Sequence, residues 1–235
     1  MSAKNNPQFH FKGPPDRLEA KAPFALPGSH WPPPEVEISN HRHVLQSQTG
    51  DDESGPSLSF KLPAHTPPGT TKAMVHVGNE SYPATIEVQE LTKIITEPQT
   101  VILAGVPGSK TAATVQVMNA GNVSKGIEPA QTIVLRRADA VSRGVRKAFK
   151  ETSGDLVSRL IVLGEHLSSE PSAQATVDFK SDFSALPAGD QRNVEISVHI
   201  PDGLERSVKW SGNLSLLGMA VTVTLDVLDR EGENR

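Results

Sequence analysis

The spacing of apolar residues near the C-terminus constrains the fold of this chain more than any other feature. Apolar side chains occupy every second position in two runs: Val194, Ile196, Val198 and Ile200, and then Met219, Val221, Val223, Leu225 and Val227. A turn-forming Pro-Asp-Gly sequence follows the first run. Successive Cβ atoms of a strand point to opposite faces, so this spacing places the apolar residues on one face. The segment from Asp190 to Val227 is therefore predicted to form the closing strands of a β-sandwich.

The composition favours a thin all-β architecture over a large enzyme with a deep pocket. Of the 235 residues, 36% are hydrophobic but only 4% are aromatic, so the core must consist mainly of Val, Ile, Leu and Ala. A chain of this length can form one large domain or two small ones. The formal net charge of -4 gives no general attraction to nucleic acid or anionic lipid, so no nucleic-acid partner is expected.

The sequence predicts neither a membrane span nor a secretory signal. No apolar run approaches the ~20 residues that a membrane-spanning helix needs. The N-terminal sequence MSAKNNP lacks the apolar region of a signal peptide. Cysteine does not occur, which excludes disulfides and thiolate chemistry but does not select a compartment. The default expectation is a cytoplasmic location, and export by another route stays open.

Residues 1–34 are predicted to form an extended, Pro-rich arm. Its many prolines, including three in succession at positions 32–34, disfavour helices and strand ladders. The arm also carries four aromatic residues: Phe9, Phe11, Phe24 and Trp31. Disordered segments are usually poor in aromatic residues. Two interpretations follow: a passive tail, or an arm that docks these rings on its own or a neighbouring subunit. The second interpretation makes these four the predicted partner-binding residues.

The rest of the chain is predicted to contain two related β modules in tandem. Residues 35–90 form a small first β unit, and residues 91–230 form the second module. The sequence LSFKLP from Leu58 to Pro63 matches ISVHIP from Ile196 to Pro201. In both places a Gly-containing loop, a strand, a turn and a terminal strand follow. Repeated use of one supersecondary unit indicates two modules of the same kind.

The second module resembles bacterial immunoglobulin-like domains in its pattern of turns. Between Pro98 and Asn122 the chain reads PxxV…GxPGSKTAxxVxVxNxGN, which is similar to the first strands of such domains. The sequence from Leu186 to Pro201 is similar to their later strands, and the resemblance covers about Pro98 to Val227. It implies a seven-stranded sandwich that serves binding, spacing or assembly and rarely chemistry.

Residues 127–183 are too long for the usual connecting strands of that family and are predicted to contain an insertion. Val141, Val145 and Phe149 recur every fourth residue while basic residues occupy the other faces, which predicts one short amphipathic helix. The apolar run from Leu156 to Leu163 fits either a strand or a buried helix. The fold class is thus all-β, with tandem immunoglobulin-like sandwiches, an extended N-terminal arm and a short helical insertion.

No catalytic, cofactor or metal site is predicted. His41 and His43 would share one face of a strand, a spacing at which paired imidazoles can bind zinc or copper, but no further ligand is specified nearby. The turn from Gly105 to Thr111 lacks the GxxxxGK spacing of a phosphate loop. No nucleophile elbow is recognisable. The chain is therefore expected not to be an enzyme and to bind no cofactor.

The insertion carries a basic cluster: Arg136, Arg137, Arg143, Arg146, Lys147 and Lys150. This cluster could contact phosphate or an acidic partner, but a solvated helix face is the favoured interpretation.

These patterns predict a non-enzymatic structural or interaction protein that makes protein–protein contacts within an assembly, through sheet edges and the arm. The partner would be another protein or a second copy, which would give a homo-oligomer. The alternative is a carbohydrate- or surface-binding accessory module. Such a site usually exposes planar aromatic rings, for which Trp31, Tyr82 and Trp210 are the available candidates. Self-association in solution would favour the assembly, and a monomer would favour the accessory module.

Overall fold

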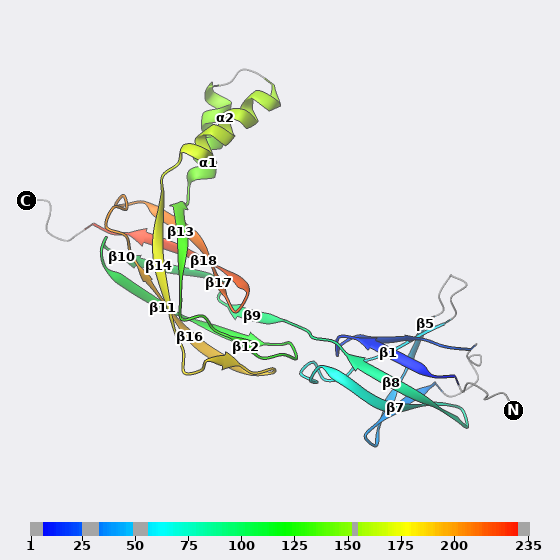
Figure 1. The fold of residues 1–235 in the computed structure, drawn as a ribbon. Coiled ribbons are helices and arrows are strands. Elements are labelled where there is room, and N and C mark those ends of the chain that lie inside the picture. Colours follow the sequence, from blue (N-terminus) through cyan, green and yellow to red (C-terminus); the bar gives the residue numbers. More distant parts are fainter. Residues whose placement is uncertain (1–6, 25–32, 49–55, 152–154, 230–235) are drawn as a thin grey trace, which may run out of the picture. The chain divides into compact units, whose positions relative to one another are not determined.

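The computed structural model describes residues 7–24, 33–48, 56–151 and 155–229 (Figure 1). The chain divides into two compact units. The first unit contains residues 1–93 with the short segments 119–124 and 187–190, and the second contains the remainder. Each unit has its own eight-stranded sheet and its own cluster of buried apolar residues. The predicted mainly-β fold is confirmed.

The sheet of the first unit contains eight strands: β1 (Phe9–Gly13), β2 (Leu18–Lys21), β3 (Glu35–Ile38), β4 (His41–Val44), β5 (Gln46–Gln48), β6 (Ser57–Phe60), β7 (Gly69–Val77) and β8 (Glu80–Val88). Their spatial order is β4-β3-β7-β8-β1-β2-β6-β5. Val36 and Leu58 come from opposite halves of this order but are both fully buried in one core. The sheet therefore folds over on itself, and its two halves pack as the layers of a sandwich.

The N-terminal segment differs from the predicted arm, because residues 9–21 supply two strands of the first sandwich. Strand β1 pairs in parallel with β8, with Phe11 opposite Ile86 (Figure 1). Phe9 and Phe11 are fully buried, and their ring centres lie 6.3 Å apart in a stacked arrangement. Pro14 and Pro15 lie between β1 and β2, where the chain turns and the missing N–H groups interrupt no ladder. The prolines therefore mark the ends of strands.

These positions change the role of the predicted partner-binding residues. In the folded chain the rings of Phe9 and Phe11 are core and cannot reach a partner. Phe24 is half-buried and packs edge-on against Phe9, with the ring centres 5.7 Å apart. Trp31 lies outside the described residues.

The main sheet of the second unit also contains eight strands: β9 (Ile94–Glu97), β10 (Thr100–Gly105), β11 (Lys110–Asn119), β13 (Ala130–Arg137), β14 (Ser172–Lys180), β16 (Gln191–His199), β17 (Lys209–Leu216) and β18 (Met219–Val227). Their order is β10-β18-β17-β13-β14-β16-β11-β9. A short pair, β12 (Lys125–Gly126) and β15 (Ala185–Leu186), forms a separate two-stranded sheet.

The alternation at the C-terminus has the predicted register. Val194, Ile196 and Val198 of β16 are fully buried. The apolar residues of β18 from Val221 to Val227 are also fully buried, and Thr222, Thr224 and Asp226 between them are partly exposed. Period-two burial is the consequence of the pleat, with one face of each strand turned to the core.

The two units share an arrangement of strands. The last strand of each pairs antiparallel with the strand before it and parallel with an early strand, β8 with β1 and β18 with β10. The matching sequences LSFKLP and ISVHIP begin in β6 and β16, which pair with β2 and β11 respectively. This strand order is that of an immunoglobulin-like sandwich, and the predicted immunoglobulin-like pattern is confirmed.

The insertion of the second unit contains two helices instead of the one predicted. Helices α1 (Ala140–Glu151) and α2 (Leu156–Ser169) form a hairpin between β13 and β14 (Figure 1). A Cβ atom added to Gly144 would lie 2.8 Å from side-chain atoms of both Leu163 and His166. Gly144 therefore lowers helix propensity but allows the two helices to approach closely. Neither helix has the length and apolar character needed to cross a membrane.

Candidate functional site

The exposed apolar surface of the helical hairpin is the strongest candidate for a functional site. It contains seven large apolar side chains that are each between 37% and 68% exposed: Val141, Val145, Phe149, Leu156, Val157, Leu160 and Ile161. We call this surface the hairpin face. No residue of α2 is buried, although half of its 14 residues are Leu, Ile or Val. An apolar helix of this kind is normally covered by other protein.

The residues that α1 contributes lie along one stripe. Each of them follows by one position a buried residue: Val141 follows Ala140, Val145 follows Gly144, and Phe149 follows Ala148. The buried small residues recur every four positions and so share the side of α1 that meets α2. The stripe is therefore turned by about 100° from the contact with α2.

The exposed residues of α2 lie on the same side of the hairpin as this stripe. Leu163 faces Gly144, which marks the side of α2 that meets α1. Leu160, Val157 and Ile161 are turned from Leu163 by about 60°, 120° and 160° in the direction of increasing residue number. In an antiparallel pair viewed from one end, the direction of increasing residue number runs clockwise around one helix and anticlockwise around the other. Rotation in the direction of increasing residue number thus leads to the same side in both helices, so these three residues of α2 adjoin the stripe of α1. Leu156 is turned by only about 20° from Leu163 and extends the exposed apolar surface at the first residue of α2.

An ion pair between Arg143 of α1 and Glu170, at the end of α2, joins the two helices on the side away from the hairpin face. The Arg143 guanidinium lies 2.5 Å from a Glu170 carboxylate oxygen, and His166 Nε2 lies 2.8 Å from the other oxygen. The Glu170 side chain is only 5% exposed, so these contacts are shielded from water and salt. The guanidinium carbon of Arg159, which comes from α2, lies 4.5 Å from the ring centre of Phe149, a residue of the hairpin face.

Helix α2 also begins at a defined cap. Asp155 Oδ1 accepts a hydrogen bond of 2.9 Å from the backbone N–H of Ser158. This bond lowers the pKa of Asp155, because it stabilises the charged carboxylate. The start of α2 is thus fixed by a local interaction that does not involve the sandwich.

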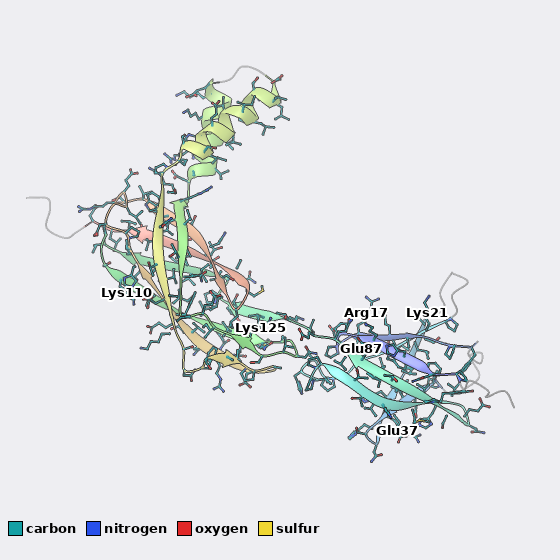
Figure 2. All side chains as sticks on the ribbon, viewed as in Figure 1. Arg17, Lys21, Glu37, Glu87, Lys110 and Lys125 are labelled. Atoms are coloured by element: carbon teal, nitrogen blue, oxygen red, sulfur yellow. The ribbon has the colours of Figure 1, made fainter. Side chains whose placement is uncertain are left out.

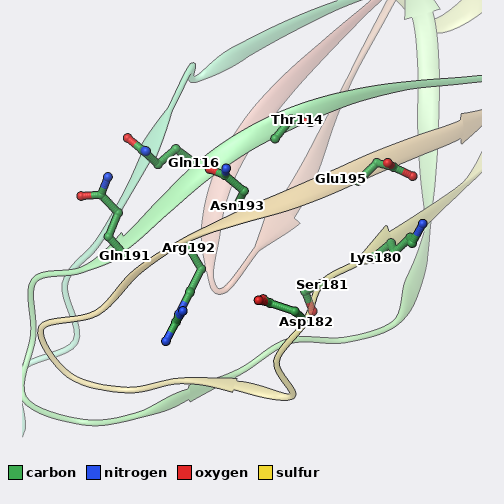
Figure 3. A pocket seen from close by; sticks show the side chains of 9 residues that line it. All are labelled: Thr114, Gln116, Lys180, Ser181, Asp182, Gln191, Arg192, Asn193 and Glu195. Atoms are coloured by element: carbon green, nitrogen blue, oxygen red, sulfur yellow. The ribbon is translucent and has the colours of Figure 1, made fainter.

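A polar hollow of about 700 Å³ is the second candidate site (Figure 3). It lies over β11, β16 and the end of β14, and its lining residues are Thr114, Gln116, Lys180, Ser181, Asp182, Gln191, Arg192, Asn193 and Glu195. The lining thus combines amides with acidic and basic groups, and it contains no aromatic ring. The hollow can offer hydrogen bonds to a polar ligand but no surface for ring stacking.

The other aromatic residues considered for sugar binding do not form an exposed platform. Trp210 is 3% exposed, and its Nε1–H donates to the backbone oxygen of Glu205 at 3.4 Å. Tyr82 is half-buried against Phe9 and Phe24 in the first unit. Two of the three candidate rings, Tyr82 and Trp210, are therefore packed against a core, and the third, Trp31, lies outside the described residues.

The paired histidines lie in β4 and make separate contacts. His41 Nδ1 lies 3.1 Å from the backbone oxygen of Ser39, and the His43 ring packs against Phe60 with ring centres 5.8 Å apart. Within the described residues there is no group of three or more His, Asp or Glu side chains placed to hold a metal ion.

Two residues of the predicted basic cluster, Arg137 and Arg143, are paired with carboxylates. Arg137 pairs with Asp139 and Glu205, and Arg143 pairs with Glu170. Another surface cluster lies on the sandwich of the second unit, where Lys110 (labelled in Figure 2) and His199 both contact the Asp178 carboxylate, at 2.7 and 3.0 Å. The hydrogen bond from Lys110, followed by that from His199, lowers the pKa of Asp178.

Comparison with known proteins gives only remote structural likenesses. No family model and no curated protein sequence matches this chain. A Porphyromonas gingivalis protein of unknown function is 11% identical, with 95% of this chain and 98% of that chain covered and a TM-score of 0.28. Tandem Ig domains of titin are 9% identical, with coverage of 97% and 95% and a TM-score of 0.24.

A third solved structure is SGBP-B of the Bacteroides ovatus mixed-linkage glucan utilization locus, in complex with a mixed-linkage heptasaccharide. It is 9% identical with a TM-score of 0.25, and this chain spans 99% of its own length but only 52% of that chain. Likenesses at this level carry no argument about function. The immunoglobulin-like assignment rests on the strand order described above.

Proposed function

We propose that this chain is a non-enzymatic interaction protein that makes protein–protein contacts within an assembly through its hairpin face. The observation that supports this proposal is the exposure of α2, which is rich in Leu, Ile and Val but has no buried residue. From the exposed fractions, the hairpin face presents on the order of 700 Å² of apolar surface, more than the ~300–600 Å² of the largest patch on a typical monomer.

The apolar residues of the hairpin face do not contribute to the core of the sandwich. No residue of α1 or α2 belongs to the core cluster of the second unit. The hairpin is stabilised instead by the small residues of α1, the cap at Asp155 and the shielded ion pair of Arg143 and Glu170. Exposed Leu and Ile side chains in a separately stabilised element cost solubility and favour binding. We infer that the sandwiches act as a scaffold that presents the hairpin.

Crosslinking in a native extract tests this function. The tagged full chain would be treated with a lysine-reactive crosslinker, and crosslinks from Lys147 and Lys150, the two lysines of α1, would be identified by mass spectrometry. We expect these lysines to be linked to another protein chain, and we expect Leu160→Asp to abolish the links. Ile102→Asp is the matched control, since Ile102 is an apolar residue of the second unit that is 75% exposed but lies outside the hairpin. Links that persist in Leu160→Asp would contradict the proposal.

The polar hollow favours a second candidate function, that of a carbohydrate-binding accessory module. Its amides and carboxylates are suited to hydrogen bonds with sugar hydroxyls. Calorimetric titration with soluble oligosaccharides, comparing the wild type with Asn193→Ala, tests this alternative. Binding that is lost in Asn193→Ala would support it, whereas no heat of binding with any class of oligosaccharide would remove it.

A further inference from the structure

We infer that the hairpin face binds a second copy of itself, so that two hairpins form a four-helix bundle around a two-fold axis. This inference rests on the proposed function and makes its partner specific. A two-helix hairpin with one apolar side has the shape of half a four-helix bundle. Two identical apolar faces can cover each other completely, and a two-fold axis makes every contact occur twice.

The area of the face is suited to a stable dimer. About 700 Å² of apolar surface per copy is close to the ~800 Å² per partner that standard specific interfaces bury. Gly164 leaves open space on this face, because a Cβ atom placed there would meet no atom within 4 Å. A side chain from a facing helix can enter that space, as knobs enter holes in helix bundles.

The charges at the edges of the face select the orientation of the two copies. Arg146 and Lys150 follow Val145 and Phe149 by one position, so the outer edge of α1 is basic. Glu165 follows Gly164 by one position and makes the outer edge of α2 acidic. A two-fold axis parallel to the helices places α1 of one copy against α2 of the other, so that basic and acidic edges meet. An axis across the helices would place α1 against α1 and bring like charges together.

The charge of the hairpin disfavours a lipid surface as the occupant. Residues 139–170 contain five acidic and five basic residues, which gives no net charge. Interfacial helices that bind anionic membranes have a polar face rich in Lys and Arg. A neutral hairpin with edges of opposite sign fits its own copy better.

The first test is the oligomeric state of the purified full chain, measured by sedimentation equilibrium over a range of concentrations. We expect a reversible dimer for the wild type and for the control Ile102→Asp. Leu160→Asp should raise the dissociation constant at least ~30-fold, because it places one buried carboxylate from each copy in the interface. Ile161→Asp should do the same, and unchanged circular dichroism would show that both variants fold. A dimer that Leu160→Asp and Ile161→Asp leave intact would overturn the inference.

A wild type that remains monomeric at every concentration would also overturn this inference. The proposed function fails separately, since crosslinks from Lys147 and Lys150 to a different protein in the extract would still support it. The two experiments therefore distinguish self-association from binding to another partner.

The second test determines the orientation and uses the lack of native cysteine. Val145→Cys and Ile161→Cys are each introduced alone, and the two variants are mixed under mild oxidation. Val145 is level with the Ile161–Gly164 region across the hairpin, because Gly144 faces Leu163. The parallel two-fold axis therefore predicts disulfide-linked heterodimers in excess of Val145→Cys homodimers. An excess of those homodimers would show α1 against α1 and would refute the proposed axis.

Discussion

Replacement of Phe11 by Ala should destabilise the whole first unit. The Phe11 side chain is 0% exposed in β1, and its ring meets Phe60 edge-on with the ring centres 5.1 Å apart. Truncation of a buried Phe to Ala costs about 3–5 kcal/mol, from lost burial and from the cavity left behind. A domain is stable by about 5–15 kcal/mol in total, so this loss is a large share of the stability of the unit. Deletion of residues 1–34 would remove β1 and β2 entirely and should unfold the unit.

Amide hydrogen exchange followed by mass spectrometry reports the two units separately. Phe11→Ala should accelerate exchange in peptides from β7 and β8 and leave peptides from β17 and β18 unchanged. His10→Ala is the control, because His10 is an exposed neighbour on the opposite face of the same strand and its loss should cost well under about 1 kcal/mol. If Phe11→Ala left the protection of β7 and β8 unchanged, residues 9–13 would not be a strand of this core and the arm interpretation would return.

Two further predictions concern the second unit. Val223→Asp should unfold it, because an unpaired carboxylate at a 0% exposed position costs several kcal/mol. Thr224→Asp, on the other face of the strand, should cost well under about 1 kcal/mol. Equal losses of stability in urea unfolding would mean that the register is shifted by one residue. The pKa of Asp178 is lower in the folded protein than its value of about 3.9 in the unfolded chain. Its contacts therefore stabilise the fold above pH ~3.9, and this stabilisation is lost as the pH falls through the lower pKa of the folded state. Asp178→Asn should therefore melt at a lower temperature than the wild type at pH 6, and the difference should shrink at pH 3; a constant difference would show that the contact with Lys110 does not set this pKa.

The fold of the second unit could be predicted because burial and periodicity agree there. In β18 one face is buried from Val221 to Val227 and the other is partly exposed. In β16 the residues of the other face are polar, although Ser197 among them is buried, so the apolar residues of both strands alternate over several positions. The match between LSFKLP and ISVHIP could be found for the same reason, because β6 and β16 occupy equivalent positions in their sheets. Such patterns are visible in the sequence wherever a strand has one solvent-exposed face and one buried face.

The first two strands could not be predicted in the same way because they are short and lie next to prolines. Phe9, Phe11 and Gly13 are buried while His10 and Lys12 are exposed, so the alternation exists but covers only five residues. Strand β1 is paired with β8, which is more than 60 residues away along the chain. No local signal specifies such a long-range partner. Phe9 and Phe11 were the informative feature of this segment, and both are buried in the core of the first unit.

The hairpin face was missed in part because an apolar run does not reveal what covers it. The sequence from Leu156 to Leu163 fits a buried helix, and the structure makes it a helix whose residues are all at least partly exposed. The spacing of Val141, Val145 and Phe149 was visible, but such a stripe normally marks the side of a helix that packs on its own domain. Here the side that packs is the neighbouring stripe of small residues, Ala140, Gly144 and Ala148. When small residues form the contact between two helices, the large apolar residues next to them are left on another surface. A stripe of small residues beside a stripe of large apolar residues therefore distinguishes a binding hairpin from a core helix.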